Sequence, residues 1–177
     1  MLLRTLILLL VCFSAGANPL KLTQHRWSVG GDASLAYYFE PSTLAGFELG
    51  LKPQASYFVW DGLELSLAGH VSALLFSNDP YGYEKQPARW GLGFAARYYF
   101  DVGRIFFPYV GLFAGFNMIN NWSGSFRYEL GPTTGLLIAL TDSLALDVSL
   151  VIKATLVGTN FVRAEIAPTT LGIRYFF

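Results

Sequence analysis

The chain has 177 residues, a length that suits a single domain. Hydrophobic residues make up 53% of it and charged residues only 14%, whereas about 25% charged residues is ordinary for a soluble domain. Twelve basic and twelve acidic residues give a formal net charge of zero, which argues against nucleic acid as a partner. A long unbroken apolar run occurs only at the N-terminus. The other apolar residues are spread through the chain, as in a barrel whose outer wall faces lipid.

The N-terminal segment has the features of a secretory signal peptide. Arg4 provides a positive charge, residues 6–13 form an apolar stretch, and residues 15–17 (Ala-Gly-Ala) form a cleavage motif. The apolar stretch is shorter than the roughly 20 residues that a transmembrane helix needs, which disfavours the alternative of a retained anchor. We therefore predict that residues 1–17 are removed, together with the only cysteine, and that residues 18–177 form the mature domain.

Eight segments of the mature chain alternate apolar and polar residues with the period of a β-strand. In the seventh, Leu144, Leu146 and Val148 alternate with Ala145 and Asp147. Most of the segments reach the nine to eleven residues that a transmembrane strand needs, whereas soluble strands usually have about five or six. The pattern predicts an all-β fold, an eight-stranded antiparallel up-and-down transmembrane β-barrel. The predicted strands are residues 27–39, 47–59, 63–75, 90–100, 109–118, 126–140, 144–154 and 169–177.

Aromatic residues gather at both ends of these segments, as they do at the two interfaces of a membrane. One predicted girdle consists of Tyr57, Trp60, Tyr98, Phe100, Phe106, Phe107, Tyr175 and Phe177. The other consists of Tyr37, Phe39, Phe47, Phe76, Trp122, Phe126 and Phe161. The connections at residues 60–62, 101–107 and 141–143 lie at the same predicted end as both termini and are interpreted as periplasmic turns. The predicted outer loops are residues 40–45, 77–89, 119–125 and 157–161.

Three stretches resemble the outer-membrane β-barrel domain family, which comprises small porin-like or OmpA-type eight-stranded barrels. They are Pro53–Leu67 (PQASYFVWDGLELSL), Pro108–Gly115 (PYVGLFAG) and the terminal Leu171–Phe177 (LGIRYFF). The resemblance covers essentially the whole mature chain. It implies a multi-pass barrel in the outer membrane of a Gram-negative bacterium, in contact with outer-membrane lipids. It also implies that Tyr175 and Phe177 form the signal read by the barrel-assembly machinery.

The alternation places five acidic and five basic residues on the inward faces of the predicted strands. Because an eight-stranded barrel is only wide enough for side chains to fill, and because buried charges must be paired, we predict a lumen filled by ion pairs. This network favours a structural or surface-interaction role over transport. The predicted charges are Asp32, Glu48, Lys52, Glu64, Arg97, Arg127, Glu129, Asp147, Lys153 and Arg174.

A narrow porin-like channel for ions or small solutes is the alternative. Glycines on the inward faces of the fourth to sixth segments favour it, because small residues there could leave a path for water. The same glycines could instead make room for Arg97, Arg127 and Tyr109. The alternation alone does not distinguish the two arrangements.

His70 and Ser72 are the only pair that suggests catalysis. A histidine base beside a serine nucleophile would suit a lipid-modifying barrel enzyme, and residues two apart on a strand share a face. However, no acidic residue at a convincing spacing completes a triad. We therefore expect no enzymatic activity, and the sequence contains no pattern that requires a cofactor or a metal ion. It does not identify an external ligand.

Overall fold

A computed structural model describes residues 20–40, 44–77, 89–103, 105–119, 126–157 and 160–177. The predicted signal peptide, residues 1–17, lies outside the described residues, as do most of the predicted loops 77–89 and 119–125. No helix in the described part of the chain is long and apolar enough to cross a membrane.

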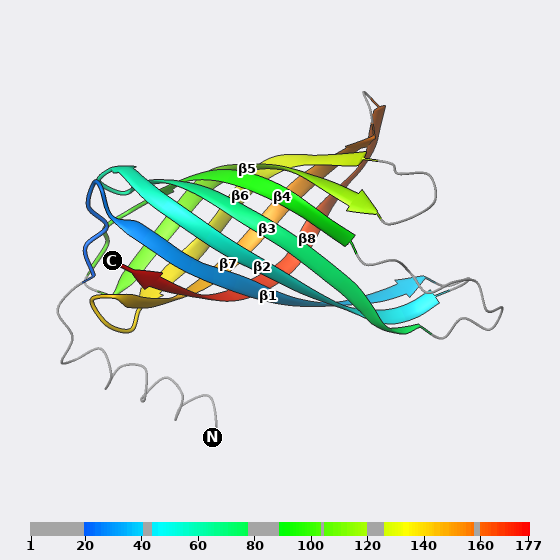
Figure 1. The fold of residues 1–177 in the computed structure, drawn as a ribbon, viewed down its shortest axis with the longest axis horizontal. Helices are drawn as coiled ribbons and strands as arrows, with labels where there is room; N and C mark the ends of the chain where they lie inside the picture. The colour runs from blue at the N-terminus through cyan, green and yellow to red at the C-terminus, as the bar shows by residue number, and fades with distance from the viewer. Residues whose placement is uncertain (1–19, 41–43, 78–88, 104, 120–125, 158–159) are drawn as a thin grey trace, which may run out of the picture.

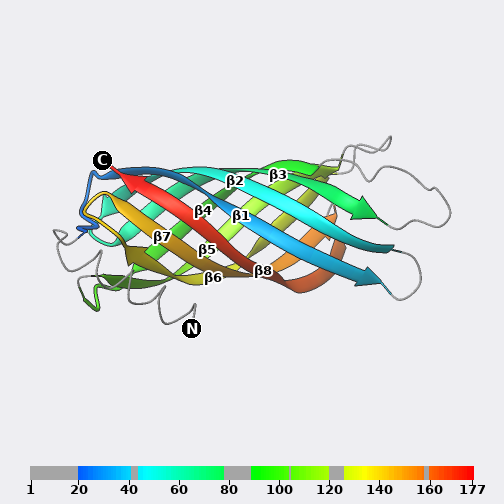
Figure 2. The same cartoon turned by 90° about the horizontal axis from the view of Figure 1, so that it is seen from below.

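The described chain forms a closed antiparallel barrel of eight strands (Figures 1 and 2). Each strand pairs with its neighbours in sequence, and β1 pairs with β8, so the sheet has no free edge in the wall. This arrangement confirms the predicted up-and-down barrel. The strands are β1 (Trp27–Glu40), β2 (Leu44–Trp60), β3 (Leu63–Ser77), β4 (Arg89–Tyr99), β5 (Phe106–Ile119), β6 (Phe126–Ala139), β7 (Leu144–Val157) and β8 (Asn160–Phe176).

The predicted strand boundaries agree with the structure to within about three residues, apart from the start of β8. β8 begins at Asn160, within the predicted loop 157–161, and β2 begins at Leu44, within the predicted loop 40–45. These two loop predictions were therefore wrong in extent. β2 and β8 each have 17 residues, more than a bilayer requires. The start of β8 was missed because its apolar residues Val162, Ala164 and Ile166 are out of phase with Leu171 and Ile173, across a register shift between β7 and β8.

The alternation predicted from the sequence separates an apolar outer face from an enclosed inner face. Leu112, in the middle of β5, is 68% exposed on the outer face. On β4, Tyr98 is exposed whereas Tyr99 is buried inside the barrel. Other exposed apolar residues include Val29, Leu51, Leu67, Phe94, Val110, Leu130, Leu171 and Ile173.

The aromatic girdle predicted at the end with the short turns needs one correction. Phe107 is buried inside the barrel, whereas its neighbour Phe106 is exposed on the outer face. The sequence prediction placed both residues at the edge of a turn, but β5 begins at Phe106, so strand geometry directs Phe107 inward. Apart from Phe107, the members of this girdle do not face the lumen. The side chains of the other predicted girdle lie outside the described residues.

Three connections lie at the end of the barrel that also holds the C-terminus, as predicted (Figure 1). The shortest joins β2 to β3 through Asp61 and Gly62. Gly62 has a φ of 75°, a left-handed conformation that a tight hairpin requires and that glycine adopts without strain. The described N-terminal residues begin at this same end (Figure 2).

Candidate functional site

An N-terminal plug, residues 20–26, crosses the mouth of the barrel before β1 begins. Leu20 and Leu22 are buried there although they precede every strand. The backbone N–H of Gly62 donates to the carbonyl of Leu22 at 2.9 Å, and the N–H of His25 donates to the carbonyl of Phe58 at 2.8 Å. The plug is therefore hydrogen-bonded to the β2–β3 hairpin.

Arg26 fixes the other end of the plug. Its guanidinium donates to the carbonyls of Lys21 and Asp142, both at 2.6 Å, and lies 5.5 Å from the ring centroid of Phe176. Partial burial lowers the pKa of Arg26, while the neighbouring Asp142 raises it. Because an arginine side chain stays protonated in proteins, these contacts keep their charge at neutral pH.

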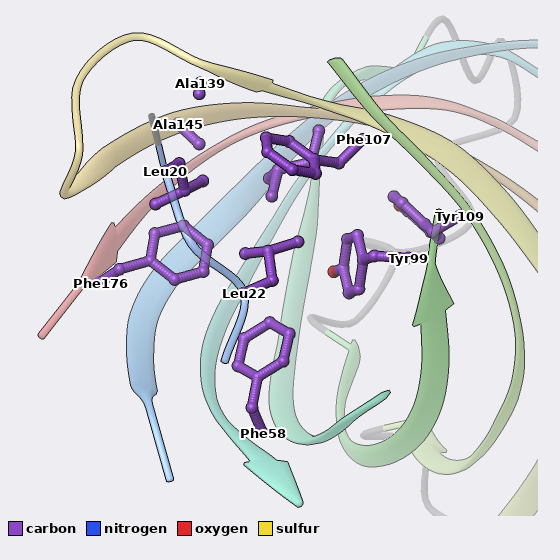
Figure 3. Packing of buried hydrophobic residues seen from close by; sticks show 10 residues of the cluster. Leu20, Leu22, Phe58, Tyr99, Phe107, Tyr109, Ala139, Ala145 and Phe176 are labelled. Carbon is purple, nitrogen blue, oxygen red and sulfur yellow. The ribbon is translucent and has the colours of Figure 1, made fainter. Parts of the chain in front are cut away.

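The side chains of the plug complete an apolar cluster inside the barrel mouth (Figure 3). Leu20 and Leu22 lie among rings that come from β2, β4, β5 and β8. The cluster buries several large apolar side chains across the opening, and Leu20, Leu22, Tyr99 and Phe107 also line a partly open pocket at this end. The cluster consists of Leu20, Leu22, Phe58, Tyr99, Phe107, Tyr109, Leu137, Ala139, Ala145 and Phe176.

A charged layer lies next along the lumen, with the carboxylate of Glu64 at its centre. Glu64 is completely buried. Arg174 binds it through two nitrogens, Nη1 at 2.6 Å and Nη2 at 2.9 Å, and Arg97 Nη1 donates to it at 3.2 Å. The hydroxyl of Tyr99 adds a fourth bond at 2.9 Å. Two arginines and a tyrosine thus satisfy one carboxylate, with the two-pronged geometry that makes arginine–carboxylate pairs strong.

A second carboxylate, Asp147, completes this layer. Arg174 Nε lies 3.2 Å from Asp147 Oδ2, and the hydroxyl of Tyr109 donates to Asp147 Oδ1 at 2.9 Å. Arg97 also donates to the side-chain oxygen of Gln54 at 3.2 Å. We define the charged layer as Glu64, Arg97, Tyr99, Tyr109, Asp147 and Arg174.

A cavity of about 80 Å³, the chamber, lies on the outer side of the charged layer. This volume is enough for several water molecules. The salt bridge between Lys153 Nζ and Glu129 Oε1, 3.0 Å long, lies on its wall. Asp32 and Lys52 line it too, and they are opposite each other in the register of β1 and β2.

The predicted lumen charges fall into separate groups. The structure brings together Glu64, Arg97, Asp147 and Arg174 in the charged layer, and Glu129 and Lys153 in one salt bridge. Asp32 and Lys52 line the chamber. Arg127 is half-buried on the inward phase of β6, and the side chain of Glu48 lies outside the described residues. The sequence pattern placed these charges inside but did not indicate which would meet.

Inward-facing glycines make room for large side chains at the level of the charged layer. A Cβ on Gly135 would lie 2.5 Å from the phenol oxygen of Tyr109. A Cβ on Gly111 would lie 3.1 Å from Cγ of Arg97. Of the two arrangements considered from the sequence, space for Arg97 and Tyr109 is the one found at these two positions.

Sequence reasoning missed several residues that fill the lumen. The roles of Tyr99 and Gln54 as partners of the charges follow from contacts between strands, which no single segment reveals. Phe58 and Phe113 interrupt the polar character of the inward phase, and Phe113 contributes to the chamber wall. The only sequence signal that they face inward was their position in the alternation, because each lies an even number of residues from a polar inward residue.

His70 and Ser72 both lie on the inward phase of β3. His70 lines the chamber, and Ser72 is buried. The hydroxyl of Ser72 has no hydrogen-bond partner among the described residues. No group of three or more potential metal ligands occurs in the described part of the chain. At the end of β8, the rings of Tyr175 and Phe177 are exposed, with centroids 6.4 Å apart.

An apolar outer wall, a closed ring of long strands and an interior of paired charges define a class of protein, because only a lipid solvent favours an apolar exterior around a polar interior. The chain is an integral, multi-pass β-barrel of the outer-membrane class. No family model and no curated protein sequence matches it.

Solved structures of outer-membrane barrels share the fold. The N-terminal β-barrel domain of OprF from Pseudomonas aeruginosa is 16% identical with a TM-score of 0.58, and the match covers 87% of this chain and 98% of that one. Neisserial surface protein A is 18% identical with a TM-score of 0.58, over 86% of this chain and 96% of that one. OprG from Pseudomonas aeruginosa is 15% identical with a TM-score of 0.53, over 90% and 98%. At these identities the likeness shows the fold alone.

Proposed function

We propose that the protein is a non-conducting barrel with a structural or surface-interaction role in the outer membrane. The observation that carries this proposal is the pair of consecutive barriers in the lumen. The plug and its apolar cluster close the mouth, and the fully buried Glu64–Arg174 pair lies directly behind it. An ion that crossed the barrel would have to displace both barriers.

Planar-bilayer conductance tests the closed lumen. Protein whose folding is verified by heat-modifiable gel migration is expected to be electrically silent. Discrete, reproducible openings would overturn the proposal in favour of a narrow channel. In that event Arg97→Ala and Arg127→Ala should change the conductance, because Arg97 belongs to the charged layer and Arg127 is on the inward phase of β6.

A deletion strain tests the envelope role separately. Loss of the protein is expected to change detergent sensitivity, surface binding or envelope stress, and expression of the intact chain should restore the parental behaviour. A deletion strain that matches its parent in all three measurements would contradict a structural or surface role, whatever the conductance result.

The proposal includes no catalytic activity. It is supported by the inward placement of His70 and Ser72, since the acyl chains of membrane lipids lie against the opposite face of β3. Overexpression is expected to leave the acylation of lipid A and of phospholipids unchanged, and Ser72→Ala should behave identically. A changed lipid profile that Ser72→Ala abolishes would contradict this part of the proposal.

A further inference from the structure

Two chamber residues of opposite charge lack direct partners. Asp32 and Lys52 both line the chamber, yet neither has a hydrogen bond or a salt bridge to any residue that the structure describes. By contrast, Glu129 and Lys153 on the same wall form a salt bridge of 3.0 Å. Neighbouring charges act on both groups, but their polar atoms make no direct hydrogen bond with a described residue, so water or a bound solute can provide one.

The neighbouring strands locate the carboxylate of Asp32. Asp32 lies between Lys52 of β2 and Gly172 of β8 in the sheet register. A Cβ on Gly172 would lie 2.0 Å from Asp32 Oδ1, so the carboxylate occupies the space that the missing side chain leaves. Asp32 Oδ1 therefore lies against β8.

Only certain solutes would satisfy both groups. A simple anion would bind only Lys52, and a simple cation would bind only Asp32. A small molecule that carries one ammonium and one carboxylate could bind both side chains without adding net charge to the lumen. The chamber volume of about 80 Å³ suits a solute of a few heavy atoms in place of several waters.

Arg97 offers a further donor at the inner boundary of the chamber. It lines the chamber, and its side chain is about nine-tenths buried. Its Nη1 is committed to Gln54 and Glu64, but its Nε has no hydrogen-bond partner among the described residues. A buried donor without a partner carries a free-energy cost that a solute oxygen would remove.

We propose that the chamber binds a small zwitterionic solute with the chemistry of a free amino acid. Asp32 receives the solute ammonium, Lys52 receives its carboxylate, and Arg97 Nε is the additional donor to the carboxylate. The proposal goes beyond the closed-barrel function, because binding at this level requires no passage through the charged layer.

Solution NMR of the purified, isotope-labelled protein in detergent micelles can test this assignment, with glycine, acetate and methylammonium as probes. Glycine is expected to produce saturable shifts of backbone amides in β1 and β2. Acetate and methylammonium, each carrying half of the charge pattern, are expected to produce no saturation at the same concentrations. Asp32→Asn and Lys52→Met should each weaken glycine binding at least about tenfold.

Two control variants carry the same chemical changes away from the chamber. Asp101→Asn and Lys21→Met alter exposed residues at the opposite end of the lumen and should leave glycine binding unchanged. Lack of saturable binding of glycine to the parent protein would overturn the proposal, as would acetate binding as tightly as glycine. Undiminished binding in both chamber variants would also overturn it. The comparison of the three probes needs only the parent protein, so it remains decisive even if a variant fails to fold.

Discussion

Removing the charge of Glu64 should be among the most damaging single changes in the lumen. The carboxylate is 0% exposed and receives bonds from Arg97, Arg174 and Tyr99. In Glu64→Gln the side chain keeps its shape, but the two arginines remain buried, with Asp147 as the remaining carboxylate of the charged layer. Breaking a buried ion pair on one side costs about 3 to 5 kcal/mol, a large part of the roughly 5 to 15 kcal/mol that stabilises a typical domain.

Glu129→Gln is the matched control for this prediction. The same substitution there removes the single salt bridge between Glu129 and Lys153. The side chains of these two residues are 12% and 21% exposed. The cost of Glu129→Gln should be smaller than that of Glu64→Gln, because it breaks one ion pair, whereas Glu64 accepts bonds from three side chains. Urea unfolding in lipid vesicles, followed by heat-modifiable gel migration, measures both free energies. Equal losses for Glu64→Gln and Glu129→Gln would refute the idea that Glu64 organises the charged layer. A Glu64→Gln, Arg174→Met double variant should lose less than the sum of the single variants, because one change removes the charge that the other leaves unpaired.

Two further predictions concern the plug and the outer wall. Leu22→Ala should lower the free energy of unfolding by about 2 to 3 kcal/mol because Leu22 is buried in the apolar cluster, whereas the exposed Lys21→Ala should change it by less than about 0.5 kcal/mol. The same urea assay measures both, and a Leu22→Ala loss as small as that of Lys21→Ala would show that the plug does not close the mouth. Leu112→Arg should cost about 2 to 4 kcal/mol in vesicles, because Leu112 lies mid-strand on the lipid-facing wall. Val102→Arg is the matched control: Val102 is 67% exposed and Leu112 is 68% exposed, but Val102 lies in a turn between strands. Val102→Arg should therefore be tolerated, and equal losses at both positions would contradict a lipid-facing wall.

The outer wall could be predicted from the sequence because contact with lipid constrains the residues of each strand separately. Every strand that crosses lipid must present apolar residues at every second position, so Leu144, Leu146 and Val148 identify a strand without reference to any other segment. The prediction failed at two places. The first part of β8 alternates in the opposite phase, with Val162, Ala164 and Ile166 out of step with Leu171 and Ile173 across a register shift against β7. Phe107 lies at the boundary between turn and strand.

The contacts inside the lumen could not be predicted in the same way. Glu64 and Arg174 are 110 residues apart and come from β3 and β8, which are not adjacent in the sheet. Their meeting depends on the register of every strand in the ring, which no alternation pattern contains. The plug was missed for a related reason. Leu20 and Leu22 form too short a pattern to signal a buried element, and only the closed mouth gives them something to bury against.

The order of the three levels along the lumen follows from how each one satisfies its polar groups. Apolar side chains can close the mouth because the plug supplies its own backbone bonds to the β2–β3 hairpin, including Gly62 N–H to Leu22. Charges can lie behind that closure only if they are fully paired, and Glu64 and Asp147 meet this condition through Arg97, Arg174 and two tyrosines. On the outer side of the charged layer, Asp32 and Lys52 form no direct salt bridge with a described residue, and both line the chamber. Barrels that share less than a fifth of their sequence with this chain have the same wall. The wall therefore does not distinguish the function of this protein from theirs, and the distinguishing residues must lie in the lumen or in the outer connections.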